Sequence, residues 1–164
     1  MGVEETLDVK TRAFLDAART ATLATIDPTG RPRLVPICFV VGALGGDGRA
    51  RLYSPLDEKP KSAPDPHELA RVRDLLARPE ATVLVDRWSE DWGRLGWVRL
   101  EVRAELIEPV PQDGDEGAHG DEHEAAVAAL RAKYSQYAGH RIEVRPILRF
   151  TVERTVAWGD LGSG

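Results

Sequence analysis

The chain has 164 residues, 42% of them hydrophobic, and 22 Lys and Arg against 27 Asp and Glu give it a net charge of −5. This length supports one hydrophobic core, so we expect a single domain over residues 1–164. No apolar run reaches the ~18 residues of a membrane span, and no secretory leader pattern is present at the N-terminus. The acidic balance argues against nucleic acid, and the single cysteine, Cys38, fits a reducing compartment. We therefore expect a cytoplasmic protein without membrane or nucleic-acid partners.

The first half of the chain predicts one helix followed by a hairpin. Residues 6–19 carry apolar side chains at helical spacing. The β-rich run 21–26 precedes Asp27-Pro28-Thr29-Gly30, a turn signal with proline second and glycine fourth. Residues 31–41 predict the return strand, and 49–54 predict a further strand after a glycine-rich loop.

The second half alternates helices with longer strands. Asp65-Pro66-His67-Glu68 predicts a helix start, because Asp65 can cap, proline suits the first position and Glu68 completes a capping box. A second capping box at Asp121 predicts another helix. Further strands are predicted over 81–85, 94–107 and 146–158, and residues 109–120 form an acidic loop rich in Pro and Gly.

These elements define a fold class. Strands joined by short turns favour an antiparallel sheet over a parallel βαβ sheet. We expect a mainly β protein, with six strands closed into an antiparallel β-barrel and two or three helices packed on it.

No catalytic motif stands out. The glycines at 42–48 lack the Lys-Ser/Thr of a phosphate loop and predict a flexible connection. His119 and His123 straddle a predicted helix start in an acidic run, so we predict no metal site. There is no Ser/His/Asp or Cys/His relay, and the catalytic residues remain unassigned.

Two stretches suggest binding chemistry. Residues 52–62 leave a strand, present Ser54 and then place Lys59 and Lys61 around a proline, shortly before a helix that bears Arg73. Such a cluster could bind a phosphate through charge-assisted hydrogen bonds, although a solvated surface loop is an equal alternative on these residues alone. Residues 85–99 hold three of the four tryptophans, interleaved with arginine, and could wall a planar heterocycle.

Several of these segments resemble a known superfamily. The segments that show the resemblance are Ala21-Thr22-Leu23-Ala24-Thr25-Ile26 with Gly30-Arg31-Pro32 and Pro36, then Asp57-Glu58-Lys59-Pro60-Lys61, Asp86 with the run Glu90 to Arg99, Lys133-Tyr134 to Tyr137, and Val156-Ala157-Trp158-Gly159. Together they resemble the pyridoxamine 5'-phosphate oxidase-like split β-barrel superfamily, whose fold is of the FMN-binding type. The Asp-Trp-x-Arg-Leu run is similar to the coenzyme F420-dependent (flavin/deazaflavin oxidoreductase) branch.

The resemblance implies a homodimer with two cofactor sites where the barrels meet. It implies that the strand around Val35, Pro36 and Ile37 lies against the cofactor ring. Trp92 would pack near the ring or come from the partner subunit. The implied phosphate-binding residues are Ser54, Lys59, Lys61 and Arg73, and the stretch between Lys61 and Arg73 is longer than in short family members.

The resemblance also implies an activity. It implies an oxidoreductase that transfers hydride from reduced F420 to a small organic acceptor, with the protein supplying binding and orientation. This agrees with the lack of an acid or base motif. Two alternatives stay open: FMN as the cofactor, because both cofactors present a phosphate to basic residues, and a non-catalytic deazaflavin carrier.

Overall fold

The computed structural model describes residues 7–56, 64–111 and 119–162. Within them, one antiparallel sheet has the strand order β2-β1-β5-β6-β7-β4-β3. The mainly β class predicted from the sequence is confirmed. The strands are β1 (Ala21–Ile26), β2 (Pro32–Ile37), β3 (Val40–Val41), β4 (Arg51–Pro55), β5 (Glu80–Arg87), β6 (Gly96–Ile107) and β7 (Ile147–Gly159).

The prediction of six strands was wrong, because the described residues form seven. The run 31–41 was expected to be one return strand, but β2 ends at Ile37 and β3 begins at Val40. These two strands lie at opposite edges of the sheet, so the sheet curls into a half-barrel whose edges approach each other at Cys38 and Phe39. The hydroxyl of Tyr134 accepts a hydrogen bond from Phe39 N (3.1 Å) and fixes this crossing. The apolar run contains no turn residue there, which is why the sequence concealed the break.

Three α-helices complete the described fold: α1 (Val9–Ala17), α2 (Ala70–Ala77) and α3 (Gly120–Lys133). Short 3-10 turns cover Pro66–Glu68, Trp92–Arg94, Ser135–Gly139 and Ile142–Val144. The helix predicted to start at Asp65 was wrong in its boundary. Asp65 Oδ1 accepts from His67 N (2.9 Å) and caps only a 3-10 turn, and the extended backbone of Leu69 separates that turn from α2. Asp121 likewise does not cap α3, whose N-cap residue is His119.

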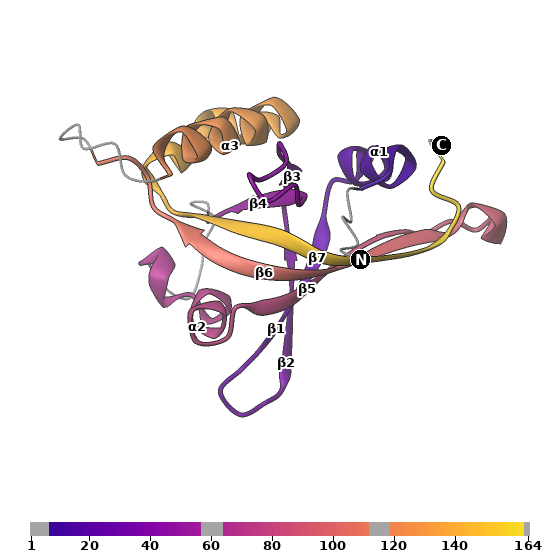
Figure 1. Ribbon diagram of the computed structural model, residues 1–164, viewed down its shortest axis with the longest axis horizontal. Helices are drawn as coiled ribbons and strands as arrows, with labels where there is room; N and C mark the ends of the chain where they lie inside the picture. The colour runs from indigo at the N-terminus through magenta and orange to yellow at the C-terminus, as the bar shows by residue number, and fades with distance from the viewer. Residues whose placement is uncertain (1–6, 57–63, 112–118, 163–164) are drawn as a thin grey trace.

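The hydrophobic core has two parts, divided by the sheet. Side chains such as Leu23, Leu52 and Leu100 fill the barrel interior, together with residues of α1 and α2. Residues of opposite strand parity, such as Tyr53 and Ile107, point outward and pack against α3. Figure 1 shows α2 and α3 on opposite sides of the long β6–β7 pair. A register shift between Glu101 and Val102 lets that pair bend around the barrel.

The outer face of the sheet is thus covered only in part. α3 covers β3, β4 and the Ile147 end of β7, whereas none of the described residues covers the outer face of β2, β1, β5, the Gly96 end of β6 and the Gly159 end of β7. Leu34 (64% exposed) and Trp158 (55%) lie on this bare half. No helix among the described residues is long and apolar enough to cross a membrane.

Candidate functional site

A trough of about 650 Å³ runs across the bare outer face of the sheet. Its uncharged lining comes from four adjacent strands: Thr22, Ala24, Leu34, Thr82, Leu84 and Trp97. Asp86 and Arg99 supply the charged groups. Because all these residues have outward strand parity, their side chains form one surface. A flat, mostly apolar floor with a few polar groups suits a planar ring.

The predicted ring-binding strand, β2, is the edge strand of the sheet and lines this trough with Leu34. Pro36 pairs with Thr22, which in turn pairs with Leu84, so Pro36 lies on the same outer face as the trough, two residues along β2 from Leu34. Val35 and Ile37 have the opposite parity and turn into the barrel core. The sheet therefore offers the side chain of Pro36, and only the backbone of its two neighbours, to an outer ligand. A proline in an edge strand leaves no ladder hydrogen bond unmade.

A second groove, of about 550 Å³, lies between α2 and the β1–β2 hairpin. Arg33 and Arg73 line it, together with Asp74. Asp74 is buried and accepts hydrogen bonds from Thr25 Oγ1 (2.8 Å) and from Arg33 Nε (2.8 Å). That hydrogen bond and the charge of Asp74 raise the pKa of Arg33. The groove therefore holds one fixed and one freely exposed guanidinium beside a single carboxylate.

The trough and the groove lie on opposite faces of the β1–β2 hairpin. Ala24 and Leu34 line the trough, whereas Arg33 lines the groove and Thr25, buried on that same face, donates to Asp74. A ligand that occupies both has to pass around β2. The position of β2 at the sheet edge leaves that route open.

The other predicted phosphate residues do not share one described site. Ser54 is only 2% exposed and lies in β4, with the inward parity of Leu52, opposite Leu148 of β7. Lys59 and Lys61 lie outside the described residues. Arg73 is exposed on α2 and faces the groove. The structure thus puts Arg73 beside Arg33 and buries Ser54 in the barrel wall.

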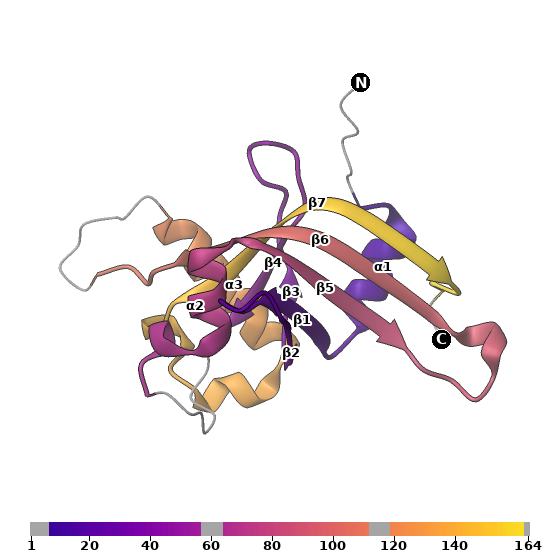
Figure 2. The same cartoon turned by 90° about the horizontal axis from the view of Figure 1, so that it is seen from below.

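Trp92 lies far from this groove within one chain. α2 precedes β5, whereas Trp92 follows it in the β5–β6 turn (Figure 2). The eight residues of β5 separate the two ends by roughly 25 Å at the usual strand rise. Trp92 is 76% exposed and Trp88 70% exposed. This turn, residues 88–95, is the tryptophan turn. It is therefore positioned to contact a ligand at the far end of the trough or a neighbouring molecule.

Sequence reasoning missed Arg33, Asp74 and Trp97 as site residues. Arg33 lies in the predicted hairpin and Asp74 in the predicted helix, but neither residue belongs to a recognisable motif. Trp97 was considered only as one of three tryptophans in the run 85–99 and was not singled out, yet its alternation along β6 turns it outward into the trough. The signal that could have found it was the alternation along β6, in which Val98 and Leu100 are the buried positions.

A third group of ionisable side chains lies under α3 and ties that helix to the sheet. Glu122 accepts from Tyr53 Oη (2.5 Å), Arg51 Nη1 (3.0 Å) and Arg149 Nη1 (2.7 Å), and Arg149 also bonds Glu105. Burial, and then the bond to Glu122, raises the pKa of Tyr53. Burial also raises the pKa of Glu122, but the bond from Tyr53 and the charges of Arg149 and Arg51 outweigh it and lower that pKa. Two arginines balance two glutamates, which is typical of a structural network.

The glycine-rich loop covers this network. A Cβ at Gly42 would lie 2.4 Å from the Tyr53 ring, and one at Gly45 would lie 2.4 Å from Arg51 Nε. The loop needs glycine there because it approaches both side chains closely.

His119 and His123 do not face each other: His119 Nδ1 lies 3.3 Å from Glu122, whereas His123 is buried with Nε2 2.9 Å from Arg145 O.

Comparison with known proteins assigns this architecture to a class. The family model described as pyridoxamine 5'-phosphate oxidase matches residues 7–159. The chain therefore belongs to the pyridoxamine 5'-phosphate oxidase family, which confirms the superfamily resemblance. No curated protein matches the chain.

Solved structures agree on the fold. The chain is similar to the conserved hypothetical protein Rv2991 of Mycobacterium tuberculosis, with 20% identity, a TM-score of 0.65, and 97% of this chain and 89% of that one covered. An FAD-binding protein of Mesorhizobium loti matches with 20% identity and a TM-score of 0.55, over 92% and 94% of the chains. The heme storage protein HutZ of Vibrio cholerae matches with 14% identity and a TM-score of 0.59, over 93% and 94%.

Proposed function

We propose that the protein is a coenzyme F420-dependent oxidoreductase that reduces a small organic acceptor. The observation that carries the proposal is the uncovered trough beside the edge strand β2, which suits a planar ring. The bound deazaflavin would supply the hydride chemistry. The choice of F420 rests on the resemblance of the Asp91-Trp92-x-Arg94-Leu95 run to that branch.

The residues of the chain would bind and orient this cofactor. The outer face at Pro36 and Thr22 would contact the ring, and Arg73, with Lys59 and Lys61, would attract its phosphate and acidic tail. The buried Asp74 holds Arg33 at the groove wall, so that group is oriented before any ligand arrives. The apolar lining would exclude water from the ring.

The proposal includes a homodimer formed through the bare face of the sheet. Exposed Leu34 and Trp158 lie on this face, and Trp92 lies at its end. Contiguous exposed apolar surface of this kind marks an interaction site. A second copy placed there would cover the trough and could bring its own Trp92 turn toward the groove that the first copy's turn does not reach.

Titration with F420 tests the cofactor assignment. We expect micromolar binding by wild type, and about 10- to 150-fold weaker binding by Lys61→Ala if a charged hydrogen bond to phosphate is lost. Lys10→Ala, an exposed lysine on α1, is the matched control and should bind like wild type. Absence of F420 binding by wild type at micromolar concentration would overturn the assignment.

An FMN-dependent enzyme is the second candidate, and the similarity to an FAD-binding protein favours it. A purified protein with a flavin spectrum, together with tighter binding of FMN than of F420, would support FMN. Binding of F420 without turnover over a broad panel of acceptors would instead indicate a carrier.

Heme is a further ligand to compare, because HutZ is a heme storage protein. Two described histidines are already engaged: His67 by Asp65 (2.8 Å) and Glu108 (2.6 Å), and His123 by a backbone carbonyl. These contacts argue against either ring as an iron ligand. A heme titration followed at the Soret band distinguishes heme binding from F420 binding.

A further inference from the structure

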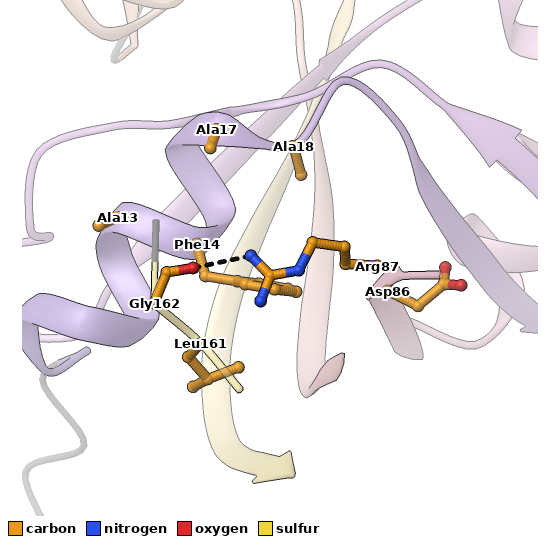
Figure 3. Close-up of a pocket in the computed structure, with 8 residues that line it drawn as sticks. All are labelled: Ala13, Phe14, Ala17, Ala18, Asp86, Arg87, Leu161 and Gly162. Atoms are coloured by element: carbon orange, nitrogen blue, oxygen red, sulfur yellow. Dashed lines mark hydrogen bonds between the residues drawn. The ribbon is translucent and has the colours of Figure 1, made fainter. Parts of the chain in front are cut away.

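One side chain, Arg87, joins the C-terminal segment 160–162 to the tryptophan turn. Arg87 is the last residue of β5, and its guanidinium donates to Arg94 O (3.1 Å) on the turn. It also donates to Asp160 O (2.7 Å), Asp160 Oδ2 (3.0 Å) and Gly162 O (2.7 Å). The guanidinium carbon lies 5.4 Å from the ring centroid of Phe14 on α1. Figure 3 shows the Arg87 guanidinium over the Phe14 ring and hydrogen-bonded to Gly162 O.

The backbone at the same place is packed too closely for side chains. Asp160 N donates to Leu95 O (2.8 Å). A Cβ at Gly96 would lie 2.2 Å from Asp160 O, and one at Gly159, where φ is +81°, would lie 2.2 Å from Leu95 O. The end of β7 and the return side of the turn therefore form one tightly fitted unit, with Arg87 across it.

The turn itself is ordered by local hydrogen bonds. Asp91 Oδ1 accepts from Gly93 N (2.9 Å), and Asp91 N donates to Ser89 Oγ (3.1 Å). Even so, both indole rings on the turn are largely exposed. The turn thus presents two aromatic side chains from a backbone that is fixed at its base, and such fixing lowers the entropy cost of binding.

We propose that Arg87 is a positioning residue, which together with residues 160–162 holds the turn so that Trp92 can contact the cofactor. The inference rests on the proposed function, because the ligand of the turn is taken to be the deazaflavin. The guanidinium acts through the turn and touches no ligand itself. Its planar fork suits this role because its four hydrogen bonds reach three carbonyls and one carboxylate.

Two variants remove this restraint independently. Arg87→Met keeps apolar contact with Phe14 and loses the hydrogen bonds, and a chain ending at Gly159 removes their C-terminal acceptors. Arg131→Met is the matched control, because Arg131, in the last turn of α3, also donates to two carbonyls (Tyr137, His140) and one carboxylate (Glu143). The readouts are hydrogen exchange of amides 88–95 and the Kd for F420.

We expect faster exchange across 88–95 and about tenfold weaker F420 binding in both variants, with the double variant no weaker than either alone. Trp92→Ala should itself weaken binding, and Arg87→Met should add nothing in that background. Arg131→Met should leave exchange at 88–95 and F420 binding unchanged.

Three results would overturn the inference: amides 88–95 that stay protected in both variants, additive losses in the double variant, or a loss from Arg87→Met that persists without Trp92. The last of these would mark a merely structural role. If wild type does not bind F420, the proposed function fails, and the exchange data still decide whether Arg87 restrains the turn.

Discussion

The outer face of the sheet has two halves, which differ in whether their outward apolar side chains are covered. Over β3, β4 and β7, α3 covers the outward side chains, and a balanced network around Glu122 joins helix to sheet. Over β2, β1, β5 and β6, the corresponding positions are left uncovered, although Leu34, Leu84 and Trp97 are as apolar as their counterparts. An apolar sheet face without a cover within the described chain calls for a ligand or a second molecule.

This contrast separates stability from binding. Side chains under α3 pack and hydrogen-bond to other residues of the described chain, so changes there should lower the free energy of unfolding and leave ligand affinity unchanged. Side chains on the bare half contribute little to a single chain, so changes there should affect association and ligand binding.

The largest effect on the covered half is expected for Glu122→Ala. It leaves Tyr53 and Arg51 without their carboxylate partner, so we expect a loss of about 3 kcal/mol in urea unfolding. Glu143→Ala removes an exposed partner of Arg131 and should cost less than about 1 kcal/mol. Weaker F420 binding by Glu122→Ala, at a temperature where the variant is folded, would contradict the separation of the two halves.

The matching change on the bare half is Leu34→Asp. Leu34 is 64% exposed in one chain, so the variant should unfold within about 0.5 kcal/mol of wild type at protein concentrations where both are monomeric. In a dimer, the new carboxylate at position 34 would be buried without a partner, so association should weaken by about 100-fold or more. Sedimentation-equilibrium ultracentrifugation measures this change. Leu44→Asp, on the β3–β4 loop, is the control; equal dimerisation of both variants would contradict an interface on this face.

The sequence predicted most of this fold because its signals are local. The turn at Asp27–Gly30 is observed, with Thr29 N donating to Asp27 Oδ1 and Gly30 at a φ of +85°, and β1 occupies the predicted residues 21–26. The break between β2 and β3 could not be predicted, because curling of the sheet is decided by long-range pairing. The start of α2 was missed because Asp65 caps a different turn.

The candidate site was less accessible to sequence reasoning. Arg33 and Arg73 are separated by forty positions and share no motif, but α2 brings them to one groove. Trp88 and Trp92 are exposed, because a turn leaves large side chains without neighbours. Which residues face the trough depends on strand parity, and that becomes definite only when the register is known.

Arg73 tests whether an exposed side chain in the groove affects ligand binding without affecting stability. Its side chain is exposed on α2, so Arg73→Ala should leave the unfolding midpoint unchanged. If it donates to the cofactor phosphate, F420 binding should weaken by about tenfold or more. Arg78→Ala, also exposed at the end of α2 but outside the groove lining, is the control. Equal affinities for both variants would remove Arg73 from the phosphate site.

The smallest expected effect concerns His67, which belongs to neither half and ties the turn before α2 to the end of β6. Hydrogen bonds to Glu108 and then to Asp65 raise the pKa of His67. The folded chain therefore holds the proton more tightly than the unfolded chain. The resulting stability is fully present below the unfolded pKa of about 6.5 and is lost as pH rises through the higher folded value.

Urea unfolding of wild type and His67→Gln measures this contribution. Because the side chain is 44% exposed, the two should differ by less than about 1 kcal/mol near pH 5.5 and converge near pH 9. Glu108→Gln should remove most of the same difference, since Glu108 is the larger cause of the raised pKa, and it should add little in the His67→Gln background. A difference that grows with pH would reverse the sign and show that the neutral imidazole is the stabilising form.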